Sequence, residues 1–236
     1  MTIKTPLDLL EEIELRSDVF GEDGVCPISI EAGSNRRVLL VTGENGGGKS
    51  LFTKAIATSA RRQNKPSDKD FEVMSIGMEL RTTSGIQRAF LFGDEGTDST
   101  GKISIGTVLG GLRTIEARNN PHWLILDEPD VGVGEGYRRA LGELLAQVSA
   151  DLPDQTYGLV IVTHSREIAA PLIAAGATSV RVGDVRRPIR EWIETGDLPK
   201  SIDDLKSLGD RTVERFKAIT NVLREPRPTP SHGPTR

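Results

Sequence analysis

A glycine-rich segment between two regular elements constrains the fold of this chain more than any other feature. The segment runs from Gly43 to Ser50 and reads GENGGGKS. Arg37 to Thr42, before it, is an apolar and β-branched run with the length of a buried strand. Ser50 to Arg62, after it, has the pattern of a helix. The sequence therefore predicts a buried strand that turns directly into a helix, as in α/β folds.

The same segment fits the pattern G-x-x-x-x-G-K-[ST] in full, which is typical of a loop that binds phosphates. Glycines let the backbone curl with its N–H groups pointing inward, and the positive end of the following helix adds to this anion site. Lys49 is expected to reach the β- and γ-phosphates of ATP, and the Ser50 hydroxyl to ligate Mg²⁺. The alternative is a glycine-rich turn with a lysine by chance, and the flanking strand and helix argue against it. The residues expected to contact the nucleotide are Gly43, Glu44, Asn45, Gly46, Gly47, Gly48, Lys49, Ser50 and Leu51.

Two further polar segments follow apolar strands. Asp127 and Glu128 come directly after the run HWLIL, where the open edge of a parallel sheet presents its ligand-binding groups. Asp127 is expected to hold Mg²⁺ through water, and Glu128 to act as the general base on the attacking water. His164 closes the next strand at the same edge and is expected to sense the γ-phosphate. The alternatives are a helix cap for the acidic pair and an ordinary packed histidine.

The remaining pattern alternates strands with helices, which predicts an α/β sandwich with a mainly parallel sheet flanked by helices. A short helix is expected from Pro6 to near Arg16, capped by Thr5. The further expected strands are Pro27–Glu31 at an edge, Phe71–Met78, His122–Leu126, Leu159–Thr163 and Ser179–Val182. The further expected helices are Thr100–Arg118, Tyr137–Ala150 and Ser165–Ala175.

The chain of 236 residues divides, by its pattern, into a main domain over 1–187, a helical appendage over 188–223 and a proline-rich tail over 224–236 that we expect to be disordered. In the appendage, Trp192 and Ile193 are expected to pack back onto the sheet rather than to form an exposed anchor. A net charge of −4 gives no broad footprint for nucleic acid. No window approaches the roughly 20 apolar residues of a membrane span, and Cys26 is the only cysteine, so a cytoplasmic protein is expected.

Three of these features together resemble the ABC ATPase superfamily: the glycine-rich segment, the strand ending LILDEP (124–129) and the strand ending IVTHS (161–165). The family also needs a signature motif, for which DSTGK (98–102) is the candidate. Ser99 and Gly101 match the family's serine and second glycine, whereas Asp98, Thr100 and Lys102 depart from the transporter pattern LSGGQ. Because the family's signature motif contacts the partner's nucleotide, the resemblance implies a head-to-tail homodimer with two ATP molecules between its subunits.

The number of residues between the motifs narrows the set of ABC ATPase families that the chain resembles. Roughly 50 residues separate the glycine-rich segment from Ser99, which leaves little room for the helical insert of transporter ATPases or for long coiled-coil arms. The compact arrangement is most similar to the ATPase domain of the mismatch-repair MutS family, over about residues 36 to 185. The resemblance also makes Phe20 a candidate for stacking on the adenine, with a core phenylalanine as the alternative. It makes Gln87 a candidate ligand in the loop that couples the metal and the γ-phosphate to a partner.

The resemblance implies an ATP hydrolase that acts as a switch, in which two chains close over two Mg·ATP, hydrolyse them and reopen. The expected partner is a protein or DNA. A nucleotide-binding subunit of a membrane transporter is the main alternative, and a small P-loop kinase is another. A module that binds ATP without hydrolysing it is disfavoured by the presence of Lys49, Asp127 and Glu128.

Overall fold

The computed structural model describes residues 3–12, 17–63, 71–77, 99–183 and 187–224. In these residues a six-stranded sheet has the strand order β1-β6-β2-β5-β4-β3. β1 pairs with β6 in antiparallel orientation, and all the other neighbours are parallel. The strands are β1 (Ile28–Glu31), β2 (Asn35–Gly43), β3 (Glu72–Ile76), β4 (His122–Asp127), β5 (Thr156–Val162) and β6 (Ala177–Val182).

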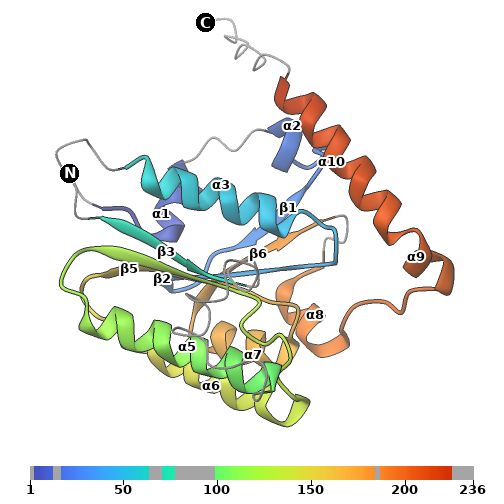
Figure 1. The fold of residues 1–236 in the computed structure, drawn as a ribbon. Helices are drawn as coiled ribbons and strands as arrows, with labels where there is room; N and C mark the ends of the chain where they lie inside the picture. The colour runs from blue at the N-terminus through green and yellow to red at the C-terminus, as the bar shows by residue number, and fades with distance from the viewer. Residues whose placement is uncertain (1–2, 13–16, 64–70, 78–98, 184–186, 225–236) are drawn as a thin grey trace, which may run out of the picture.

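Helices cover both faces of this sheet (Figure 1). One face carries α1 (Pro6–Glu12) and α3 (Lys49–Arg61). The other carries α5 (Thr100–Ala117), α6 (Glu135–Ala150), α7 (Arg166–Ala174) and α8 (Ile189–Thr195). The short helices α2 (Ser17–Phe20) and α9 (Ile202–Lys206) lie at the side, and α10 (Leu208–Arg224) runs from α9 towards α2.

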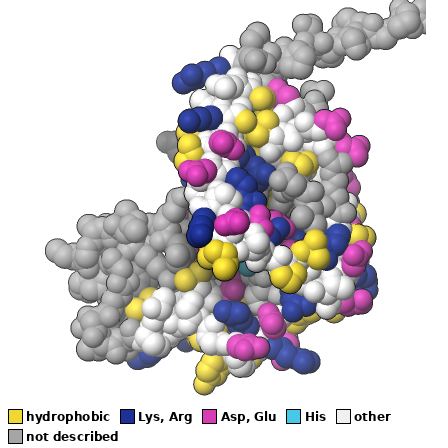
Figure 2. Space-filling view, turned by 90° about the vertical axis from the view of Figure 1, so that its right-hand side faces the viewer, with side chains coloured by type: hydrophobic (Ala, Val, Ile, Leu, Met, Phe, Trp, Pro, Cys, Tyr) yellow, Lys and Arg dark blue, Asp and Glu magenta, His cyan; other side chains and the backbone are white. Residues whose placement is uncertain are grey.

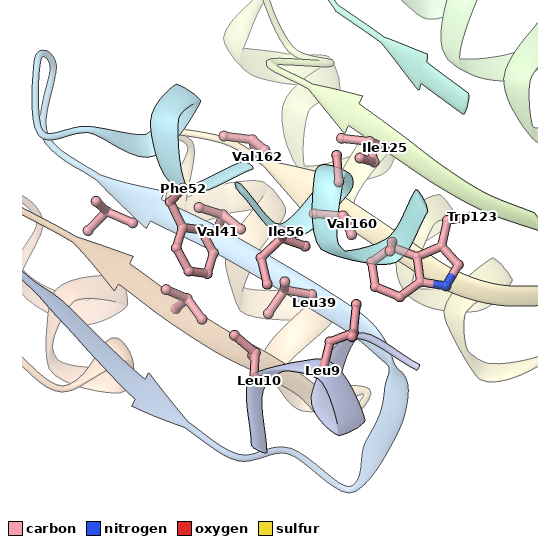
Figure 3. Packing of buried hydrophobic residues seen from close by; sticks show 14 of the residues in the cluster. Leu9, Leu10, Leu39, Val41, Phe52, Ile56, Trp123, Ile125, Val160 and Val162 are labelled. Atoms are coloured by element: carbon pink, nitrogen blue, oxygen red, sulfur yellow. The ribbon is translucent and has the colours of Figure 1, made fainter. Parts of the chain in front are cut away.

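Successive side chains of the central strands point to opposite faces of the sheet and so belong to two separate hydrophobic cores. In β2, Leu39 and Val41 face α1 and α3, whereas Val38 and Leu40 face the opposite layer. Figure 3 shows the first core, in which Phe52 and Ile56 of α3 pack on the sheet. Because both faces are covered, the central strands are apolar on both sides, as parallel sheets require.

The predicted α/β class, with a mainly parallel sheet flanked by helices, is confirmed, and β1 lies at the sheet edge as expected. The predicted N-terminal helix is shorter, because α1 ends at Glu12, and 13–16 lie outside the described residues. β5 begins at Thr156, three residues before the predicted start at Leu159. Its first residues pair with β4, and Thr156 and His122 share a buried side-chain hydrogen bond of 2.8 Å. The proposed tail lies almost wholly outside the described residues.

The segment predicted as a helical appendage contains α8, α9 and α10, and its first helix is part of the second core. Trp192 of α8 is 1% exposed, so it packs onto the body of the protein as expected. Its indole Nε1 donates to Asp197 Oδ1 at 3.0 Å, and the same oxygen accepts from Arg181 Nη2 of β6 at 2.7 Å. The Arg181 guanidinium lies 4.8 Å from the centre of the Trp192 ring. These contacts fix the chain after α8 to the sheet and so set where α9 and α10 begin.

We expect Trp192→Ala to lower the free energy of unfolding by about 3–5 kcal/mol, because it removes a buried aromatic ring and leaves a cavity. Trp192→Phe keeps most of the packing and loses the bond to Asp197, so its cost should be about 1–2 kcal/mol. Urea unfolding of both variants measures these values, with Ile193→Ala, at a half-buried neighbour, as the matched control. A cost below about 1 kcal/mol for Trp192→Ala would contradict the anchoring role.

Candidate functional site

The segment Gly43–Ser50 joins β2 to α3 and is called the glycine loop below. Its backbone packs closely against neighbouring parts of the chain. At Gly43 the backbone φ is 144°, and a Cβ would lie 2.1 Å from the carbonyl oxygen of Val182. At Gly48 φ is 104°, and a Cβ would lie 2.7 Å from the sulfur of Cys26. Both positions therefore require glycine. Cys26 is buried beneath the loop just before β1.

Lys49, the first residue of α3, holds its side chain beneath the loop. The side chain is only 8% exposed, and Nζ donates to the carbonyl oxygens of Gly43 at 3.2 Å and Glu44 at 3.1 Å. Burial lowers the pKa of Lys49 to about 8, although the charges of Glu128 and Asp127 act in the opposite direction. The loop thus holds a cation that is poorly solvated and faces two carboxylates.

Three neighbouring strands bring the predicted segments to one edge of the sheet. β2, β5 and β4 are adjacent and parallel, so the glycine loop, His164 and the pair Asp127–Glu128 all lie at their carboxyl ends. His164 Nε2 lies 3.4 Å from Glu128 Oε1, and this contact holds the pKa of the Glu128 carboxyl below its usual range. The sequence prediction that these segments meet is thereby fulfilled in space, while the chemistry they perform remains a prediction.

The backbone at Glu128 is unusual. Its φ is 52°, and it is the only residue other than glycine with a positive φ in the described part of the chain. Its N–H donates to the carbonyl of Val162 at the end of β5, at 2.9 Å. Left-handed geometry at a residue with a long side chain costs free energy and is concentrated at functional sites. Here it turns the chain immediately after β4 and places the carboxylate beside His164.

A cavity of about 300 Å³ lies over the glycine loop. Its floor contains Lys49, Ser50, Asp127, Glu128 and His164 together with the loop backbone. Helix α10 forms the side of the cavity opposite this floor. It contributes Thr212, Arg215, Phe216 and Ile219.

Ser50 and Asp127 are the residues that fit a magnesium ion. Both line this cavity and also a second one on the α3 side, so a hydroxyl and a carboxylate oxygen share one region. Mg²⁺ prefers such oxygen ligands and is commonly held by one or two protein groups together with substrate phosphates. Among the described residues no group of three or more His, Cys, Asp and Glu could hold a metal ion.

The wall from α10 is the part of the site that sequence reasoning missed. Arg215 Nη1 donates to the carbonyl of Gly46 at 2.6 Å, and Lys200 Nζ, just before α9, lies 2.9 Å from Glu44 Oε1. No motif marks these residues, and the amphipathic pattern of Leu208–Arg224 indicates a helix without saying what it covers.

The structure places Phe20 in the core and not at the cavity. Its ring is 8% exposed and packs edge-on against Phe52 of α3, with the ring centres 5.8 Å apart. The phenylalanine that lines the cavity is Phe216. The core alternative for Phe20 therefore describes this structure, and the adenine-stacking role does not fit it. Leu51 likewise packs its half-buried side chain against the core, and Gln87 lies outside the described residues.

Ser99 and Gly101 lie at the start of α5 and are not among the residues lining the cavity over the glycine loop. Ser99 caps the helix, accepting from the N–H of Lys102 at 3.4 Å. Gly101 lies against the segment after Glu128, since a Cβ there would meet the carbonyl oxygen of Gly132 at 2.5 Å. Of the predicted signature motif, Ser99, Thr100 and Lys102 are thus exposed at a helix N-terminus, and Asp98 lies outside the described residues.

No protein-family model matches the chain, and no match to a curated protein was found. Within the part of the chain that the structure describes, no helix combines the length and apolar character needed to cross a bilayer.

We expect Lys49→Met to raise the free energy of unfolding of the ligand-free chain by about 1–3 kcal/mol at pH 7, because it removes a poorly solvated charge. The pKa of Lys49 is about 8 in the folded chain against 10.5 ordinarily. Between these values the unfolded chain keeps a proton that the folded chain has released, so wild-type stability rises with pH relative to the variant.

The measurement is the difference in unfolding free energy between wild type and Lys49→Met from pH 7 to pH 10.5. The advantage of the variant should be complete below pH 8 and should disappear as the pH approaches 10.5. Lys54→Met, at an exposed lysine on the same helix, is the control and should show little pH-dependent difference. A difference for Lys49→Met that stays constant over this range would contradict the buried-charge interpretation.

Proposed function

We propose that this chain binds Mg·ATP on the glycine loop and hydrolyses it. The observation that carries the proposal is the meeting of Lys49, Ser50, Asp127, Glu128 and His164 around one cavity at the carboxyl edge of three adjacent parallel strands. Ligands of open α/β sheets bind at this edge.

Each residue has a role that its surroundings support. The N–H groups of the loop and the positive end of α3 attract the phosphates, and the buried amine of Lys49 gains a counter-charge when an anion binds. Ser50 and Asp127 would hold Mg²⁺, which supplies charge neutralisation on the phosphates. Glu128 is kept ionised by its contact with His164, so it can accept a proton from the attacking water. His164 holds the Glu128 carboxylate in place at 3.4 Å.

We expect Glu128→Gln to lower the rate of phosphate release from ATP by about 100-fold to 10,000-fold while nucleotide binding persists, because only the proton acceptor is lost. Lys49→Ala should abolish binding itself. Glu143→Gln, at an exposed glutamate on α6, is the matched control and should keep wild-type turnover. The assay follows ADP and inorganic phosphate. Full activity in Glu128→Gln would contradict its role, and phosphate found on an added metabolite would indicate a kinase.

We propose further that two chains close head to tail over two ATP molecules, as the resemblance to ABC ATPases implies. The exposed N-terminus of α5, capped by Ser99, supports this proposal because the start of a helix attracts an anion such as a partner's phosphate. A protein partner or DNA is proposed as what the closing and opening acts on, on the ground of the resemblance of residues 36–185 to the MutS ATPase domain. A transporter subunit is the alternative, and co-purification with a membrane protein would favour it.

We expect Glu128→Gln to be monomeric without nucleotide and dimeric with Mg·ATP, because hydrolysis no longer removes the bridging ligand. Ser99→Arg in that background should prevent the dimer, since a large side chain would occupy the helix N-terminus. Thr114→Arg, at an exposed position near the other end of α5, should leave the dimer intact. Light scattering measures the mass in each case. A chain that binds ATP and stays monomeric would contradict the dimer mechanism.

A further inference from the structure

Helix α10 lies over the glycine loop and comes from a part of the chain remote from the loop in sequence. Arg215 and Gly46, whose contact joins the two, are 169 residues apart. Thr212 lies at the same point, because a Cβ on Gly46 would be 2.9 Å from its hydroxyl oxygen. In Figure 1 the helix runs along the side of the molecule at which the turn into α3 lies. α10 therefore forms a roof over the cavity whose floor is the predicted phosphate site.

Both apolar and polar contacts fix the position of α10. Among the side chains of α10 that the structure describes, only Ile219 is buried, at 9% exposure. Phe216 and Val213 are 69% and 51% exposed. Figure 2 views the side that carries α8, α9 and α10, and shows Lys and Arg side chains beside Asp and Glu, with hydrophobic groups between them. The contact of Arg215 with the loop therefore adds to the packing of Ile219 and Val222 on the first core.

Arg215 and its neighbour Arg211 are held differently. Arg211 donates to the carbonyl of Asp204 at 2.6 Å and lies 3.4 Å from its carboxylate, so these contacts lie within the C-terminal helices. Arg215 is half-buried, donates to a loop carbonyl and lines the cavity that also contains Lys49 and Ser50. A guanidinium carries five donors in a planar fork, so it can keep its bond to Gly46 and also bind a phosphate.

We propose that Arg215 is a phosphate-binding residue of the site, supplied by α10 of the same chain. This inference rests on the proposed function, and it names a nucleotide polyphosphate as the group that Arg215 contacts. Lys49 approaches the loop from beneath, through the carbonyls of Gly43 and Glu44, and Arg215 approaches it from the roof, through Gly46. A polyanion between them meets a cation on each side, and Arg–phosphate contacts are among the stronger charge-assisted hydrogen bonds.

The geometry favours an α10 that contributes contacts to a bound ligand over an α10 that blocks the ligand from the cavity. A cavity of about 300 Å³ remains between α10 and the floor, so the helix borders the space and does not fill it. The three glycines of the loop at 46–48 also line this cavity, so no side chain of theirs occupies the space next to the loop.

The test measures affinity for Mg·ATP and for tripolyphosphate by calorimetry on the full chain. Arg215→Ala should weaken both by about 10-fold to 100-fold, because a charge-assisted contact to the phosphates is lost. Arg215→Lys should recover part of the loss. Lys217→Ala removes the same charge from an exposed position two residues along the helix and should bind like wild type. The melting temperature without ligand should be similar for Arg215→Ala and wild type.

The outcomes separate this inference from the proposed function. Suppose that wild type binds Mg·ATP with an affinity that Lys49→Ala abolishes and Arg215→Ala leaves unchanged. This result would overturn the role of Arg215, and the proposed function would stand. Tighter binding by Arg215→Ala would also overturn it, because α10 would then be a cover that opposes the ligand. A weakened affinity accompanied by a large fall in the ligand-free melting temperature would assign Arg215 to holding the loop. Absence of wild-type binding to Mg·ATP would overturn the proposed function itself.

Discussion

The buried amine of Lys49 is the interaction on which the rest of the site depends. A charge withdrawn from water must be compensated by hydrogen bonds and opposite charges. Here the carbonyls of Gly43 and Glu44 accept from the amine, and the carboxylates of Asp127 and Glu128 lie close enough to raise its pKa against the effect of burial. This compensation ties the curl of the glycine loop to the end of β4. The arrangement leaves a poorly solvated cation beneath the loop, which is the feature that the proposed binding of phosphates uses.

The sheet supplies the rigidity that this arrangement needs, and it also links the site to α5. Gly43 can approach the carbonyl of Val182 so closely only because β2 and β6 are paired up to that point. On the other side of the site, Thr163 Oγ1 donates to Asp130 Oδ1 at 3.0 Å, beside His164. The segment containing Asp130 then reaches α5, where Ser104 Oγ donates to the carbonyl of Val131 at 2.6 Å. Two hydrogen bonds, linked by the peptide bond between Asp130 and Val131, thus connect the residue before His164 to α5.

The sequence predicts those parts of this structure whose conformation is determined by a short local motif. The glycine loop, the acidic pair after β4 and His164 after β5 are local signals, and parallel strand pairing brings them together without further information. The start of β5 was missed because Thr156 is polar, and its strand geometry depends on pairing with His122, which is remote in sequence. Phe20 was uncertain for a similar reason, since a phenylalanine in a core and one on an adenine have the same local pattern. Arg215 could not be found at all, because its contact with Gly46 depends on where a helix after the sheet returns.

The two sides of the cavity, α10 and the floor formed at the ends of the strands, are attached to the rest of the protein by different contacts. The floor is built at the ends of strands whose apolar residues are fully buried, whereas α10 packs Ile219 and Val222 on the first core and contacts the loop through Arg215. Exposed ion pairs such as that of Lys200 with Glu44 contribute about 0–1 kcal/mol each, so this pair adds little to the attachment of the segment before α9. Under the proposed role of Arg215, a phosphate bound beside the Gly46 carbonyl would add a charge-assisted contact between α10 and the site. Closure of the roof would then follow from the charge of the ligand, while the floor, fixed by the sheet, would stay as it is.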